Sequence, residues 1–156
     1  MVAFRLPRAD LEKFRAQLAS QYKVLGPVAR GNDVVFTEIQ NAADLILNSR
    51  QSVLPPKKYF RPPTEKLFTF KERQVTEIAA SPPERRAVMG IHPCDVNGMQ
   101  ILDRVFGDTY PDPYYQRLRK NTLIVAQNCT RPCTNGFCTS FNTGPGATAG
   151  FDLALT

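Results

Sequence analysis

The fold is decided by residues 87–95, which read AVMGIHPCD. The first five residues form a short apolar run, which indicates a buried β-strand. The residues from 95 to 106 then carry apolar side chains at helical spacing, namely Val96, Met99, Leu102 and Phe106. A buried strand that leads directly into a helix predicts the first half of a parallel crossover unit.

A second apolar and β-branched run lies at residues 122–126, which read TLIVA and predict another buried strand. Between the two runs, residues 113–120 predict a helix with proline in its first turn. Residues 151–156 predict a third strand. This order predicts an α/β fold with a small mixed sheet, crossover helices and a cysteine loop at the strand ends.

The amino-terminal residues 1–51 predict a portion of α+β character. Residues 9–21 carry apolar side chains at helical spacing, and they predict an amphipathic helix. Two β-rich runs at residues 23–28 and 34–39 predict a hairpin. Asn41 is a favourable first residue for a short helix that runs to residue 48.

Residues 52–64 differ in composition, because they contain four prolines. Proline lacks the backbone N–H group, so neither a helix interior nor a central strand fits. The segment is either an extended surface connection or a stiff arm, with Tyr59 and Phe60, that packs on a partner or over a site. We therefore treat residues 1–156 as one domain with three portions: 1–51, this proline-rich arm and 65–156.

Composition excludes several classes of protein. The chain has 156 residues, and none of its apolar runs approaches the length of about 20 residues that a membrane span needs. The amino terminus has no apolar leader, so we expect a cytoplasmic protein. The net charge is +6, but the basic residues are scattered and tryptophan is absent, so a nucleic-acid partner is not predicted.

Four cysteines carry the chemical signal. Cys94 comes just after the first buried strand and Cys129 just after the second, while Cys133 and Cys138 follow with the spacing Cys-x3-Cys-x4-Cys. Because neighbouring parallel strands end at the same edge of a sheet, we expect the four thiols to converge there. Cys94 also lies at a predicted helix start, which should lower its pKa.

Clustered cysteines in a reduced compartment more often bind metal than form disulfides. Four thiolates suit an iron–sulfur cluster or zinc, and the wide spacing favours the cluster. A Cys94–His92 pair would instead suit a nucleophilic enzyme. With four cysteines present, His92 is expected at most to donate a hydrogen bond to a ligand sulfur. Arg131 would balance negative charge, and Phe137 would shield the site from water.

Several stretches also resemble a known family, the iron–sulfur electron-transfer subunits of anaerobic sulfite reductases and the beta subunits of cytoplasmic nickel–iron sulfhydrogenases. The resemblance is to the amino-terminal region of those proteins and covers nearly the whole chain. It is carried by residues 54–58, 90–95, 112–115, 128–138, 143–145 and 150–153.

The resemblance implies a non-catalytic, electron-carrying subunit of an oxidoreductase complex of anaerobic metabolism. It implies a [4Fe–4S] cluster with Cys94, Cys129, Cys133 and Cys138 as ligands. It also implies two partners, a flavin- and NAD(P)-binding subunit and a catalytic redox subunit. A structural zinc-binding interaction domain is the alternative. Family members continue into a ferredoxin-like module with further cysteines, whereas no cysteine follows Cys138 here.

Overall fold

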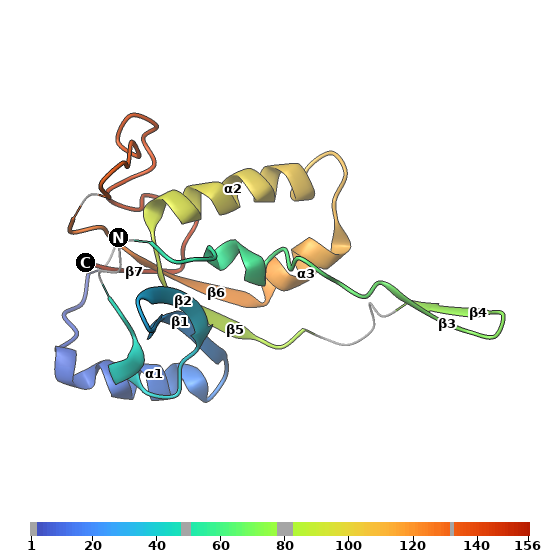
Figure 1. Cartoon of the computed structure of the whole chain (residues 1–156), viewed down its shortest axis with the longest axis horizontal. Helices are drawn as coiled ribbons and strands as arrows, with labels where there is room; N and C mark the ends of the chain where they lie inside the picture. Colours follow the sequence, from blue (N-terminus) through green and yellow to red (C-terminus); the bar gives the residue numbers. More distant parts are fainter. Residues whose placement is uncertain (1–2, 48–50, 78–82, 132) are drawn as a thin grey trace.

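The chain folds around a five-stranded sheet with the strand order β2-β1-β5-β6-β7 (Figure 1). It is seen in a computed structural model that describes residues 3–47, 51–77, 83–131 and 133–156. The antiparallel pair is β1 (Lys23–Arg30) with β2 (Asp33–Glu38). The parallel strands that follow are β5 (Arg86–Ile91), β6 (Thr122–Gln127) and β7 (Leu153–Leu155). The predicted α/β class with a mixed sheet is confirmed.

The crossover between β5 and β6 consists of two helices, α2 (Pro93–Gly107) and α3 (Pro113–Lys120). Asp112 caps α3, because its Oδ1 accepts the N–H groups of Tyr114 at 2.9 Å and Tyr115 at 3.1 Å. The strands β5 and β6 are direct neighbours and parallel, as the sequence predicts. Their carboxyl ends therefore lie at one edge of the sheet.

Both faces of the central strands are buried, which explains why β5 and β6 read as nearly unbroken apolar runs. One face packs under α2 and α3, with core residues that include Val88, Met99 and Ile124. The other face, with Met89 and Val125, packs against the amino-terminal helix α1 (Leu11–Ala19). The molecule thus has three layers, with the sheet in the middle (Figure 1).

The amino-terminal portion agrees with the predicted helix and hairpin. A short 3₁₀ turn, η1 (Arg8–Asp10), leads into α1. The helix expected after Asn41 is only one 3₁₀ turn, η2 (Ala42–Asp44), and the Asn41 side chain makes no capping hydrogen bond. Instead, a Glu12 carboxylate oxygen of α1 accepts the Ala42 N–H at 2.6 Å. Asn48, where the helix was expected to end, lies outside the described residues.

The proline-rich segment packs on this chain's own core. It forms a 3₁₀ turn, η3 (Pro56–Tyr59), and the following Phe60 is completely buried. The Tyr59 hydroxyl donates a hydrogen bond to the Phe36 carbonyl of β2 at 2.8 Å. The prediction that Phe60 serves as a partner contact is therefore wrong, because apolar residues of the sheet and helices surround its ring. The alternative prediction of an extended surface connection is also wrong, because the segment forms η3 and buries Phe60.

A second, two-stranded sheet was not predicted. It consists of β3 (Phe68–Lys71) and β4 (Gln74–Glu77), which pair antiparallel and project from the body (Figure 1). Phe70 is 76% exposed and Val75, directly opposite, is 60% exposed. None of the helices in the described part of the chain is long and apolar enough to cross a membrane.

Candidate metal centre

A β-bulge near the end of β5 directs the chain toward Cys94. The register between β5 and β6 shifts between Met89 and Ile91, and Gly90 has a φ of +73°. A Cβ atom at Gly90 would lie 2.9 Å from the Pro27 ring, so glycine meets both the conformation and the close approach. A bulge bends its strand and redirects the residues that follow. These residues are the His-Pro-Cys-Asp stretch.

Cys94 lies in the first turn of α2. His92 is the residue before the helix, and its carbonyl accepts the Val96 N–H at 3.0 Å. Pro93 occupies the first helical position and is buried, which fixes the direction in which the helix leaves the sheet. The Asn97 side chain donates to the Pro93 carbonyl at 2.9 Å. Cys94 is thus held at the carboxyl edge of β5.

Cys129 is fixed by the residue before it. The Asn128 N–H donates to the Leu155 carbonyl at 2.9 Å, and the Asn128 side chain accepts the Ala147 N–H at 2.9 Å. The Cys129 N–H itself donates to the Pro145 carbonyl at 2.9 Å. These bonds join the end of β6 to both β7 and the returning loop. Asn128 is a positioning residue that sequence reasoning did not single out.

Cys133 and Cys138 lie on the loop between β6 and β7. The Gly136 N–H donates to the Cys133 carbonyl at 3.1 Å, which closes a tight turn. Thr143 holds the Cys138 carbonyl through its N–H at 2.8 Å and its hydroxyl at 3.2 Å. Beyond it, the ideal Cβ position of Gly144 is 3.4 Å from the Cys138 sulfur and 3.9 Å from Pro93. The loop therefore rests on the start of α2.

Electrostatic interactions between these cysteines contribute to the pKa values of Cys94 and Cys129. Burial raises the pKa of the Cys94 thiol to about 11, and the charges of Asp95, Cys129 and Cys133 add to the rise. Burial also raises the pKa of Cys129, with further contributions from Cys133 and Cys138. All four thiols are free of disulfides. The convergence of all four cysteines on one site remains a prediction.

The prediction that the helix start lowers the pKa of Cys94 is wrong. Cys94 is exposed as a residue, yet enough protein surrounds its sulfur for lost hydration to raise the pKa. This loss and the neighbouring negative charges outweigh the helix dipole. A thiol with a pKa of about 11 is protonated near neutral pH, which does not suit a nucleophile. Metal binding would instead displace the proton.

The four thiols form a soft donor set for a metal. In the described part of the chain, no three His, Cys, Asp or Glu side chains stand close enough to hold a single metal ion. A tetrahedral zinc with bonds of about 2.3 Å to sulfur needs its ligands within roughly 4 Å of one another. The thiols are thus near enough to interact but not gathered for one ion. Four thiolates are the soft donor set that iron–sulfur clusters use.

The other predicted site residues lie nearby. His92 is half-buried, and its charge lowers the pKa of Asp95, which burial raises more strongly. Lys57 of η3 acts on Asp95 in the same direction as His92, and sequence reasoning missed it as part of the site. Arg131 is exposed on the cysteine loop. Phe137 is 66% exposed, so the expectation that it shields the site from water is wrong.

Comparison with known proteins gives one informative relative. No family model matches the chain, and no solved structure matches it. The chain is 36% identical over 143 residues to sulfhydrogenase 2 subunit beta of Pyrococcus furiosus, a match that spans 92% of this chain and 42% of that protein. Over nearly its whole length, this chain is therefore similar to part of a sulfhydrogenase beta subunit, which confirms the resemblance found in the sequence.

Proposed function

We propose that this chain is an electron-carrying subunit of a hydrogenase- or sulfite-reductase-type complex and holds one [4Fe–4S] cluster on Cys94, Cys129, Cys133 and Cys138. The observation that supports the proposal is that β5 and β6, which are parallel neighbours, end just before Cys94 and Cys129, and that the charge of Cys129 contributes to the raised pKa of Cys94. Similarity to a sulfhydrogenase subunit supports it. When bound, such a cluster supplies electron transfer between other cofactors.

The chain's own residues position the ligands. Gly90 and Pro93 direct Cys94, Asn128 fixes Cys129, and Thr143 holds the backbone of Cys138. His92 and Arg131 remain predicted neighbours of the ligand sulfurs. As positive or hydrogen-bonding groups, they would offset part of the thiolate charge.

The partners and location of the complex are part of the same proposal. We infer a flavin- and NAD(P)-binding subunit on one side and a catalytic redox subunit on the other, in the cytoplasm. The chain itself is proposed to carry electrons and not to catalyse bond chemistry. The raised pKa of Cys94 supports this assignment over a thiol enzyme.

Metal analysis of the chain purified without oxygen tests the proposal. We expect a brown protein with about four irons and four sulfides, the stoichiometry of a cubane cluster. Cys94→Ser should remove or convert the cluster although Cys94 is 35 positions before Cys129. Thr134→Ser, in the same loop as the other ligands, is the matched control and should keep the iron.

Two results would overturn the proposal. A colourless protein with one zinc per chain would establish the structural zinc domain. Full iron content in Cys94→Ser would show that the four cysteines do not serve one cluster.

A further inference from the structure

Apolar side chains gather on the outer surface of α2 and the cysteine loop. Ile101 and Val105, one helical turn apart, are 51% and 58% exposed. Phe137 and Phe141 are 66% and 70% exposed, and their ring centroids are 6.0 Å apart, edge to face. We call these four residues, together with Arg104, the α2–loop face.

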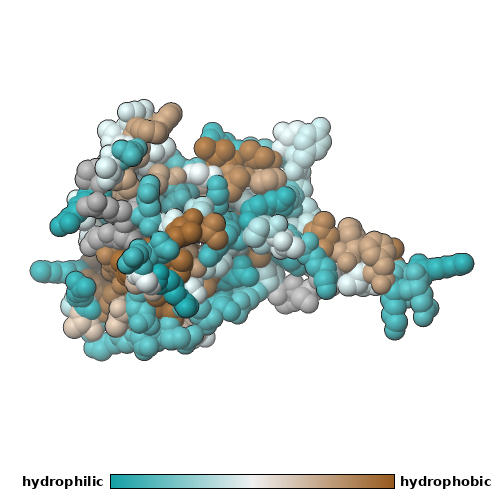
Figure 2. Space-filling model, in the orientation of Figure 1, coloured by the Kyte–Doolittle hydropathy of each residue, from teal (hydrophilic) through white to brown (hydrophobic). Residues whose placement is uncertain are grey.

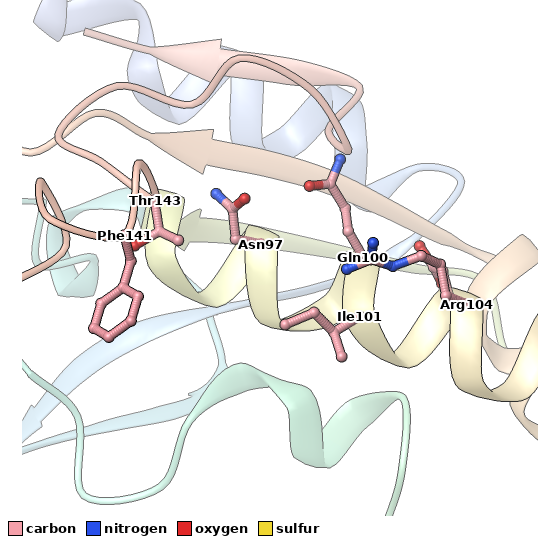
Figure 3. A pocket seen from close by; sticks show the side chains of 7 residues that line it. Asn97, Gln100, Ile101, Arg104, Phe141 and Thr143 are labelled. Atoms are coloured by element: carbon pink, nitrogen blue, oxygen red, sulfur yellow. The ribbon is translucent and has the colours of Figure 1, made fainter.

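The α2–loop face is a single surface because two of its elements line one cavity. Ile101 and Arg104 of α2 and Phe141 of the loop surround a space of about 890 Å³. Figure 3 shows these side chains on either side of the hollow, with Asn97, Gln100 and Thr143 beside them. Apolar side chains among amide and hydroxyl groups are the usual anatomy of a protein interface.

The apolar side chains of the α2–loop face are exposed side by side. Figure 2 shows hydrophobic residues over α2 and along the projecting hairpin, as well as at other places on the body. Contiguous apolar patches with a polar rim mark interaction sites on proteins. The aromatic pair is of the residue type that anchors such contacts.

Charge indicates the chemistry of the partner. Asp103, the carboxylate that lines the cavity, is occupied by the Tyr115 hydroxyl at 2.7 Å and by Arg119 at 3.1 Å. Arg104 lines the same cavity and is exposed. The charge offered to a partner here is therefore positive. Carboxylates on the partner would complement it, and arginine binds them in a bidentate manner.

The α2–loop face also adjoins the proposed ligands. Thr143 lines the cavity and holds the Cys138 carbonyl through its N–H at 2.8 Å. Phe137 directly precedes Cys138 in the chain. A protein that covers this face brings its own cofactor near the cysteines.

We propose that the α2–loop face docks a redox partner protein that presents an apolar centre surrounded by carboxylates. This rests on the proposed electron-carrying function. The partner covers Ile101, Phe137 and Phe141 and pairs its acidic groups with Arg104.

Chemical cross-linking in the complex isolated from the source organism tests the charge contact. Arg104→Lys keeps the positive charge and adds a primary amine, which a carbodiimide joins directly to a carboxylate. We expect a new cross-link from position 104 to Asp or Glu of a cofactor-containing subunit, identified by peptide mass spectrometry, and the unsubstituted chain gives the background. A cross-link to another copy of this chain, or no new cross-link in an intact complex, would overturn the proposal.

A pair of matched double variants tests the apolar contact. Ile101→Ser with Phe141→Ser should weaken association with the partner subunit at least tenfold. Phe70→Ser with Val75→Ser removes exposed apolar groups of the hairpin instead and should leave association unchanged. Partner binding retained in the first variant, or lost only in the second, would place the docking site elsewhere.

Iron content separates the two proposals. We expect iron and the visible spectrum of both double variants to equal those of the unsubstituted chain, because the substituted side chains are exposed and are not ligands. Absence of iron from the unsubstituted chain, together with the new cross-link in Arg104→Lys, would overturn the cluster and leave the docking site standing. Normal iron content, together with unchanged partner binding in the Ile101→Ser and Phe141→Ser double variant, would overturn the docking site and leave the cluster standing.

Discussion

At the scale of single residues, Gly90 sets the geometry of the site. Gly90→Ala should cost about 1–3 kcal/mol, because alanine is strained at positive φ. The Pro27 ring, 2.9 Å from the added Cβ, must also move. Urea unfolding measures the cost, and iron content should fall with it, because the bulge directs the residues before Cys94.

Gly98 is the matched control. It lies in α2, where an added Cβ meets no atom within 4 Å. Gly98→Ala should therefore stabilise the protein by about 0.5–1 kcal/mol, since alanine is the better helix former. Equal unfolding free energies for the two variants would mean that Gly90 is not required for its backbone conformation.

Tyr115 connects the two crossover helices. Its ring is 2% exposed, and its hydroxyl donates to Asp103 at 2.7 Å. Tyr115→Phe should lower the unfolding free energy by about 1–3 kcal/mol, because a buried hydrogen bond is lost. Tyr110→Phe, at an 85% exposed position, should have little effect.

The same tyrosine predicts a dependence on pH. Burial and the hydrogen bond to Asp103 raise the pKa of Tyr115 above its ordinary value. The folded protein thus holds the phenol proton more tightly than the unfolded chain. The stability from this group is complete below about pH 10 and decreases as the pH rises further. The difference between the unsubstituted protein and Tyr115→Phe should therefore narrow in alkaline unfolding experiments. A constant difference up to pH 12 would contradict the assignment.

At the scale of elements, η3 contributes to the core through Phe60. Phe60→Ala should destabilise the protein by about 3–5 kcal/mol, because the ring is completely buried. Phe70→Ala removes the same side chain from a 76% exposed position and should change stability by less than about 0.5 kcal/mol. Thermal unfolding distinguishes them. Similar midpoints would show that η3 does not hold the core.

The elements that could be predicted from the sequence are those buried on both faces. Strands β5 and β6 read as apolar runs because neither side contacts water. The described side chains of β3 and β4 are exposed on both faces. Burial therefore does not mark these short strands in the sequence. Phe60 is buried by residues that are distant in the chain. The proline-rich sequence around it therefore gives no indication of this burial.

The location of Cys94 and Cys129 at one edge of the sheet could be predicted, but their pKa values could not. Parallel neighbours bring Cys94 and Cys129 to one edge by a general rule of such sheets. The pKa of Cys94 depends on packing and on Asp95, Cys129 and Cys133. Only the folded arrangement gives those contributions.

At the scale of the whole molecule, a bound cluster would join segments that the fold connects weakly. None of the described residues of the loop from 128 to 147 is fully buried, whereas the sheet has its own core on both faces. Removing the metal without oxygen should therefore increase amide exchange across this loop and around Cys94, with small changes in β1 and β5. Uniform loss of protection across the sheet would instead mean that metal binding and global folding are inseparable.

The way β7 closes the sheet has a consequence for biosynthesis. Asn128 is bonded to Leu155 and Thr156, and Cys129 to Pro145, so residues made later secure a ligand made earlier. A nascent chain that has reached Cys138 already contains all four thiols, but its cysteine loop is not anchored. Metal delivered before residues 145–156 are made would meet an unanchored site. Cluster insertion is therefore expected to follow the synthesis and folding of this returning segment.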